Sequence, residues 1–202
     1  SDTTVVVLDS AQTRNAPMEV DPPKTTGSVR NGMTWGKRMR DSSLGIDFLH
    51  CNVSGGVMCN PTTGDHPCTS ILPLLCSRVT GAARPPYRIA YPNNGGMDSA
   101  YYAGWLEGEA ALATRIAGTA LTSKAAADSV CVANLGVDWH IAGFHEGRYI
   151  VGMDSTHYFG STWNSSLAQE GAWGFYATTN NLPMHSRFWA YLADQNPNCW
   201  DP

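Results

Sequence analysis

Several short motifs that mark common enzymes and metal proteins are missing from this chain of 202 residues. No two cysteines are spaced as Cys-x-x-Cys, so the usual zinc ribbons and thioredoxin-like redox sites are excluded. The chain also lacks Gly-x-Ser-x-Gly and the glycine-rich loops that bind phosphates or dinucleotides. The sequence therefore does not support a nucleophilic serine or cysteine, or a nucleotide site.

Long apolar runs and a strong charge of one sign are missing too. The longest apolar run, residues 71 to 76, is much shorter than the roughly 18 residues of a membrane helix. The net charge is −4, and residues 101 to 202 carry four basic and nine acidic side chains. That balance argues against a nucleic-acid surface, so we expect neither a membrane span nor a nucleic-acid partner. One basic cluster stands apart, which we interpret as a solvated loop, with polyanion binding as the alternative: Arg30, Lys37, Arg38 and Arg40.

Cysteines, in contrast, are present in an even number and in two settings. Four are crowded into one stretch, at Cys51, Cys59, Cys68 and Cys76, and two lie far apart, at Cys131 and Cys199. An even count without metal-ligand spacing indicates disulfide bonds, which persist in oxidising compartments. The chain is therefore predicted to be secreted or to lie at a cell surface, and its start at Ser1 without an apolar leader is typical of signal-peptide removal. Two N-x-S sequons, at Asn52 and Asn164, are candidate glycosylation sites.

The N-terminal residues 1 to 34 are predicted to form an extended strand and linker arm. Residues 3 to 8 are β-prone, with Val5, Val6, Val7 and Leu8 as the candidate assembly residues. Residues 9 to 34 are rich in Pro, Thr, Asn and Gly and have no periodicity. Such a strand pairs with a sheet edge of its own domain or of another copy, and the sequence leaves both open.

Residues 35 to 202 are predicted to form a single α+β domain. Its best helix covers Ala125 to Asn134, with Ser123 as N-cap, Gly136 as the stop and Cys131 on the buried face. Residues 45 to 80 are predicted to be loop-like, and residues 81 to 120 to alternate turns with short apolar stretches. Short strands are predicted at residues 139 to 144, 148 to 152, 172 to 177 and 188 to 192.

Residues 100 to 202 resemble a C-type-lectin-like domain. The resemblance is carried by Ala125-Ala126-Ala127-Asp128-Ser129-Val130-Cys131, by Asn134-Leu135-Gly136, by Trp139-His140-Ile141-Ala142, and by the aromatic segments around Trp163, Trp173 and Trp189. In that superfamily the helix cysteine bonds one near the C-terminus, which implies a Cys131–Cys199 bond and pairing of the other four cysteines among themselves.

The resemblance departs from the calcium-dependent sugar-binding members. Those members carry Glu-Pro-Asn or Gln-Pro-Asp and a Trp-Asn-Asp strand, whereas this chain has Asn196-Pro197-Asn198 beside its last cysteine and no Trp-Asn-Asp. We therefore predict no cofactor, with calcium as the alternative. The fold does not by itself fix the function.

Three histidines form the other candidate site. His140, His145 and, further along, His157 could ligate a metal, and Glu146 could serve as the base of a hydrolase. Because an extended segment would place His140 and His145 on opposite faces, such a site needs a bend at Gly143. The alternative is that these histidines are packed or hydrogen-bonded within the fold.

Aromatic residues next to amides and carboxylates suggest a ligand surface. Six of the seven tryptophans follow residue 100. Rings stack on pyranose faces while amides and carboxylates hold hydroxyls, so Trp200 with Asp194, Asn196 and Asn198 is the candidate binding set. We expect a non-enzymatic extracellular binding or adhesion module for a glycan or protein. The alternatives are a filament or layer subunit assembled through the N-terminal strand and, third, a secreted metal-dependent hydrolase.

Overall fold

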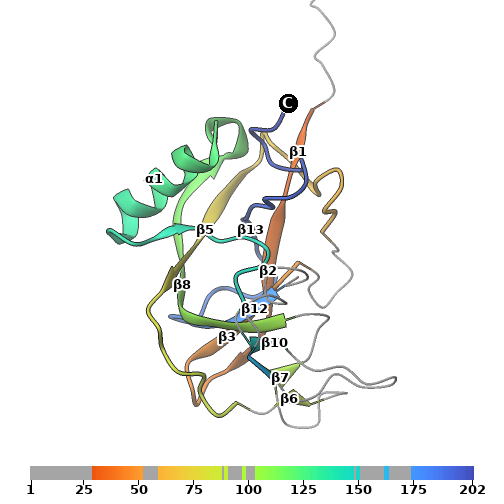
Figure 1. Cartoon of the computed structure of the whole chain (residues 1–202). Helices are drawn as coiled ribbons and strands as arrows, with labels where there is room; N and C mark the ends of the chain where they lie inside the picture. The colour runs from red at the N-terminus through yellow and green to blue at the C-terminus, as the bar shows by residue number, and fades with distance from the viewer. Residues whose placement is uncertain are drawn as a thin grey trace, which may run out of the picture.

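Figure 1 shows a computed structural model of the chain, in which the described residues are 29–51, 59–87, 89–90, 97–98, 103–147, 149–150, 162–163 and 174–202. The predictions for the arm residues Val5 to Leu8, for His157 and for the two sequons lie outside these ranges. The predicted domain boundary at residue 35 stays a prediction, and a paired strand precedes it. β1 (Asn31–Gly32) already pairs with β4 (His66–Pro67), and Thr34 begins β2.

The described residues form mostly β structure with one α-helix packed against the sheet. This is an α+β arrangement with three disulfides. One sheet is ordered β13 (Arg187–Trp189), β2 (Thr34–Asp41), β3 (Ile46–His50), β12 (Gly174–Thr178), β8 (Ala103–Ala117) and β5 (Ile71–Val79). β13 also meets β5, at Trp189 and Leu74, so these six strands close into a ring. β9 (His140–Ile141) is added to the outer edge of β5.

Shorter pairs complete the described β structure. β6 (Ile89–Ala90) runs parallel to β7 (Met97–Asp98), and β10 (Tyr149–Ile150) runs antiparallel to β11 (Thr162–Trp163). In the part of the chain that the structure describes, no helix has both the length and the apolar character needed to span a bilayer.

The turn between β2 and β3 follows directly from its residues. The Asp41 carboxylate accepts hydrogen bonds from the backbone N–H of Ser43 at 3.0 Å and of Leu44 at 3.1 Å, and from the Ser43 hydroxyl at 2.6 Å. These bonds, with that from the Ser43 hydroxyl first, lower the pKa of Asp41. Gly45 then supplies the positive φ, 68°, that lets the chain enter β3.

β5 and β8 overturn the prediction of loops and short pieces between residues 45 and 120. β8 is 15 residues long, and β5 is 9 residues long. β8 is rich in alanine and glutamate, which favour helix. Pairing with β5 on one side and β12 on the other decides its conformation, since strand preference depends on sheet neighbours more than on the residue itself.

Apolar side chains fill the closed sheet and cover its outer side. Inside, Trp35 on β2 lies edge-on to Phe144, with ring centroids 5.0 Å apart, and 5.3 Å from the ring of Phe175. Successive strand residues point to opposite faces. Tyr176 therefore lies outside, where it stacks on Phe48 at 4.3 Å. A third cluster lies between the sheet and the helix.

Helix α1 (Lys124–Leu135) confirms the helix predicted between Ser123 and Gly136 (Figure 1). The Ser123 hydroxyl accepts from Ala126 N–H at 3.0 Å, and Gly136 ends the helix with a φ of 105°. Cys131 is fully buried, as predicted.

All six cysteines are disulfide-bonded, as Cys51–Cys59, Cys68–Cys199 and Cys76–Cys131. The predicted Cys131–Cys199 bond is wrong. α1 packs its buried face on β5 and β9, which brings Cys131 opposite Cys76 with the Cα atoms 5.9 Å apart. Cys199 instead lies beside Gly32 and Gly118, where a Cβ on either glycine would overlap its sulfur. These two glycines, the second beginning the short helix η1 (Gly118–Ala120), leave the space for the Cys68–Cys199 bond.

The basic cluster is not a solvated loop. It lies largely on β2, and Lys37 is only 3% exposed. Its ammonium lies 3.1 Å from the buried Asp47 carboxylate, which also pairs with Arg40 at 2.8 Å. Lys37 and Arg40, two of the four basic residues, therefore link β2 to β3 through the buried Asp47 carboxylate.

Candidate functional site: the C-terminal pocket

A polar concavity lies between the start of α1 and the segment after β13. We call it the C-terminal pocket. Its volume is about 220 Å³, and it is lined by Lys124, Tyr191, Gln195, Asn196, Trp200 and Asp201, with Leu192, Ala193 and Asn198 completing the wall. Sequence reasoning named three of these residues together, and the fold adds partners from α1 and from the end of β13.

Asn198 shapes the pocket from below. It is 4% exposed. Its amide oxygen accepts from Leu192 N–H at 3.0 Å, and its amide nitrogen donates to the Leu192 carbonyl at 2.8 Å and to Asp201 Oδ2 at 2.7 Å. Asp201 Oδ2 also accepts from Asn198 N–H at 2.9 Å. These bonds, with the neighbouring Cys68–Cys199 disulfide, hold the last turn of chain in one conformation.

The four residues predicted to bind ligand have different surroundings. Asn196 is exposed at the rim, and Trp200 is half-buried against the third core cluster. Asn198 is buried and engaged in the bonds above. Asp194 does not line the pocket; its carboxylate is 61% exposed and lies 3.5 Å from His145 Nε2. The structure thus brings Asn196 and Trp200 together as accessible groups and separates Asp194 from them.

Tyr191 and Lys124 are two of the pocket residues that sequence reasoning missed. The Lys124 ammonium lies 5.1 Å from the centre of the Tyr191 ring and 2.8 Å from Asp128 Oδ2. Burial, with the nearby charges of Glu146 and Asp128, raises the pKa of Tyr191 to about 12. Its phenol is therefore a neutral hydroxyl that can donate to a ligand. Tyr191 lay within a predicted strand, but no sequence signal distinguished it from a core residue.

A second polar cluster, of Ser77, His140 and Glu146, lies where β5 pairs with β9. The Ser77 hydroxyl donates to Glu146 Oε2 at 2.6 Å and lies 3.1 Å from His140 Nε2. Glu146 Oε1 lies 3.4 Å from the same ring nitrogen and accepts from Gly143 N–H at 3.0 Å. In a hydrolytic triad the acid contacts the ring nitrogen remote from the serine. Here the acid and the hydroxyl share one nitrogen and Ser77 is fully buried, so the cluster fastens the turn at residues 143–146 to the sheet.

The two described histidines among the predicted metal ligands, His140 and His145, have different partners. His140 belongs to the cluster with Glu146, whereas His145 lies beside Asp194 and takes a positive φ of 72°. Among the described residues, no group of three His, Cys, Asp or Glu side chains is arranged to hold a metal ion.

His140 makes the stability of this region depend on pH. Its hydrogen bond to Glu146 raises its pKa above 6.5, against the opposing effect of burial. The charged pair therefore stabilises the fold fully below about pH 6.5, and that contribution is lost as the pH rises through the folded-state pKa. We expect the difference in urea midpoint between the wild type and His140→Gln to be larger near pH 5.5 than near pH 8.5.

A direct control measures the His140 titration by NMR. The Glu146→Gln variant removes the first cause of the shift, so the His140 midpoint should fall toward 6.5. An unchanged midpoint in that variant would contradict the assignment.

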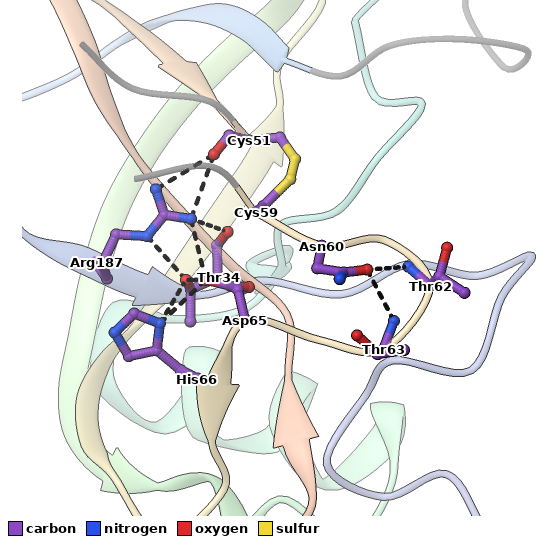
Figure 2. Close-up of a disulfide and its surroundings, with 9 residues drawn as sticks. All are labelled: Thr34, Cys51, Cys59, Asn60, Thr62, Thr63, Asp65, His66 and Arg187. Atoms are coloured by element: carbon purple, nitrogen blue, oxygen red, sulfur yellow. Dashed lines mark hydrogen bonds and ion pairs between the residues drawn. A yellow bond between two sulfur atoms is a disulfide. The ribbon is translucent and has the colours of Figure 1, made fainter. Parts of the chain in front are cut away.

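A third polar network is structural (Figure 2). The Arg187 guanidinium donates to the carbonyls of Thr34 at 2.6 Å and Cys51 at 3.2 Å, and to Asp65 Oδ2 at 3.2 Å. Asp65 also contacts Thr34 and the His66 ring. Burial lowers the pKa of Arg187, and Asp65 offsets part of that effect. The network ties β13 to β2 and to the Cys51–Cys59 loop.

Asn60 shapes the turn that follows this disulfide. Its side-chain oxygen accepts from the N–H groups of Thr62 and Thr63, both at 3.0 Å (Figure 2).

No protein-family model, curated protein or solved structure matches this chain. Its function is therefore inferred from the geometry of its own residues. The C-type-lectin-like resemblance stays a prediction for the same reason.

Proposed function

We propose that this protein is a non-enzymatic extracellular binding module, and that the C-terminal pocket binds a glycan. The observation that carries the proposal is that the rings of Tyr191 and Trp200 line the same pocket as the amides of Gln195 and Asn196. Aromatic rings stack on the apolar faces of pyranoses, and amides both donate to and accept from hydroxyls.

The amides of this pocket are available to a ligand. Gln195 and Asn196 are both exposed, and within the described part of the chain no hydrogen bond engages either side-chain amide. The wall beneath them is held by Asn198, so the pocket is largely pre-formed. Pre-formed polar sites bind with a smaller loss of conformational entropy.

Three disulfides support an oxidising compartment and hence a role outside the cytoplasm. The metal-dependent hydrolase alternative needs His157, which lies outside the described ranges, so it also stays a prediction. The filament alternative depends on residues 1 to 10, which lie outside the described ranges, so it stays a prediction.

The test is a glycan array probed with the wild type and with two pocket variants. Trp200→Ala should lower the affinity for any bound glycan about tenfold, since an aromatic contact contributes about 0.5–1.5 kcal/mol beyond its area. Asn196→Ala removes an exposed amide without touching the core and should lower it about fivefold. Met184→Ala, at a side chain that is 43% exposed and outside the pocket, is the matched control.

Two results would overturn the proposal. One is an array on which no glycan is bound above background. The other is binding that Asn196→Ala and Trp200→Ala leave unchanged while both variants remain folded by circular dichroism.

A further inference from the structure

A second pocket, which we call the sheet-face pocket, lies on the outer side of the closed sheet. Its volume is about 340 Å³, and it is lined by Glu109, Ala110, Ala111, Trp139, Thr178 and Asn180, together with Thr179. It shares no residue with the C-terminal pocket. Lys124, at the start of α1, lines the C-terminal pocket. Trp139, beyond the end of α1, lines the sheet-face pocket. The 12 residues of the helix place these ends about 18 Å apart.

The register of the sheet assembles this pocket. Glu109 on β8 is paired with Thr178 on β12 and with Arg78 on β5, so the three side chains form a row across one face. Ala111 lies on the same face of β8 as Glu109 and leaves the floor low, and Trp139 lines one side. A hollow of this size, with a small floor and one aromatic wall, is large enough for a single sugar ring.

Three polar groups around the hollow are available to a ligand. In the described ranges, no hydrogen bond engages the Thr178 hydroxyl, the Asn180 amide or Glu109 Oε1. Both bonds from Arg78 go to the other carboxylate oxygen, Oε2. The set offers a hydroxyl, an amide and a carboxylate oxygen, which together can donate to and accept from neighbouring hydroxyls.

The charge at this pocket is already balanced. The Arg78 guanidinium pairs with Glu109 and lies 5.0 Å from the centre of the Trp139 ring. It holds both side chains in place and neutralises the carboxylate. A neutral ligand therefore fits this pocket better than a phosphate or an amine.

The loop that carries Asn180 is held on both sides by the buried ion pairs of β2 and β3. Thr179 donates through its hydroxyl to Asp47, and Lys37 donates to Asn181 Oδ1 at 2.8 Å. Leu182 N–H donates to Asp47 Oδ2 at 2.9 Å. Asn180 thus lies between two anchored neighbours, exposed at the pocket rim, in a position that is set before any ligand arrives.

From these contacts we infer that the sheet-face pocket is a second binding site, for the neutral pyranose ring of a saccharide. The accessible part of the Trp139 side chain, which is 8% exposed, contacts the sugar ring, while Thr178, Asn180 and Glu109 Oε1 bond its hydroxyls. The inference stands apart from the proposed function, because the two pockets have different residues and different tryptophans.

The experiment is an NMR titration of the full chain with the methyl glycosides of glucose, galactose, mannose and N-acetylglucosamine. At least one of the four should shift the indole N–H signal of Trp139. Thr178→Val and Asn180→Ala change the rim without altering the core, and each should weaken that binding about fivefold to tenfold. Asn196→Ala, in the other pocket, is the matched control and should leave the Trp139 response unchanged.

The outcomes separate the two sites. Shifts at Trp200 alone would support the C-terminal pocket and overturn the second site. No Trp139 shift with any of the four sugars overturns the inference, as does unaltered binding in both Thr178→Val and Asn180→Ala.

Discussion

Replacing Arg187 with methionine is expected to lower the free energy of unfolding by about 3–5 kcal/mol. The guanidinium is 9% exposed and donates to Thr34, Cys51 and Asp65, so the change removes bonds to three separate segments. It also leaves the Asp65 carboxylate, only 5% exposed, without its cationic partner. An unpaired buried charge costs more than the pair contributes, which is why breaking such a pair is strongly destabilising.

Urea denaturation followed by circular dichroism measures this loss. Arg115→Met is the matched control, because Arg115 is exposed and its guanidinium bonds only a backbone carbonyl, that of Ile71, at 2.6 Å. That variant should remain within about 0.5 kcal/mol of the wild type.

A second variant tests whether the unpaired charge of Asp65 causes this loss of stability. Adding Asp65→Asn to Arg187→Met removes the stranded charge, and part of the stability should return. A single variant as stable as the wild type, or a double variant less stable than the single one, would show that the network does not act in this way.

Removing the Cys68–Cys199 bond by alanine replacement of both cysteines is expected to cost about 4.5 kcal/mol. The bond closes a separation of 131 residues, less the 55 spanned by Cys76–Cys131, so the effective loop is about 76 residues. It also joins the floor of the C-terminal pocket to the start of β5 through Cys68. The same variant should therefore weaken any ligand binding at that pocket.

Cys51→Ala with Cys59→Ala is the internal comparison, because that bond closes only 8 residues. The chain-entropy relation gives about 2.5 kcal/mol for so short a loop. The measurement is urea denaturation of both double variants under non-reducing conditions. Equal losses, or a larger loss for the short loop, would mean that chain entropy does not govern these bonds.

Two buried ionic networks, that of Lys37 with Asp47 and that of Arg187 with Asp65, neighbour the pocket-lining segments in space or in sequence. Lys37 and Asp47 lie under the loop that carries Asn180, and Arg187 precedes the strand end that leads to Tyr191. Buried charge thus anchors the loop beside the sheet-face pocket. This placement fits a module whose loops must be held in one conformation before a ligand binds.

Local signals were sufficient for α1 and for the last short strands. Ser123, the alanine-rich run and Gly136 specify a helix through contacts only three or four residues apart. The β2–β3 turn has signals of the same kind in Asp41 and Gly45, although it was not predicted. The candidate binding residues Asn196 and Trp200 came from amides that neighbour an aromatic residue in the sequence, and their binding role stays a prediction.

The elements that the sequence alone missed depend on distant partners. β8 has helix-forming residues and becomes a strand because β5 and β12 lie on either side of it. Lys37 has the character of a surface residue, and it is buried because Asp47 on the next strand faces it. The sheet-face pocket joins residues from β8, β12 and the segment after α1, and no pattern along the chain brings these together.

The sequence by itself determined that the cysteines form disulfides, where the helix begins and ends, and that nucleotide, zinc-ribbon and serine-nucleophile chemistry lack their motifs. Only the tertiary structure decided which cysteines meet, because the pairing depends on α1 lying against β5 and on Gly32 and Gly118 admitting the sulfur of Cys199. It also decided that His140 and Glu146 share one serine and that Tyr191 and Trp200 share one pocket. Local backbone conformation depends on neighbouring residues, whereas the grouping of distant side chains depends on how the sheet closes.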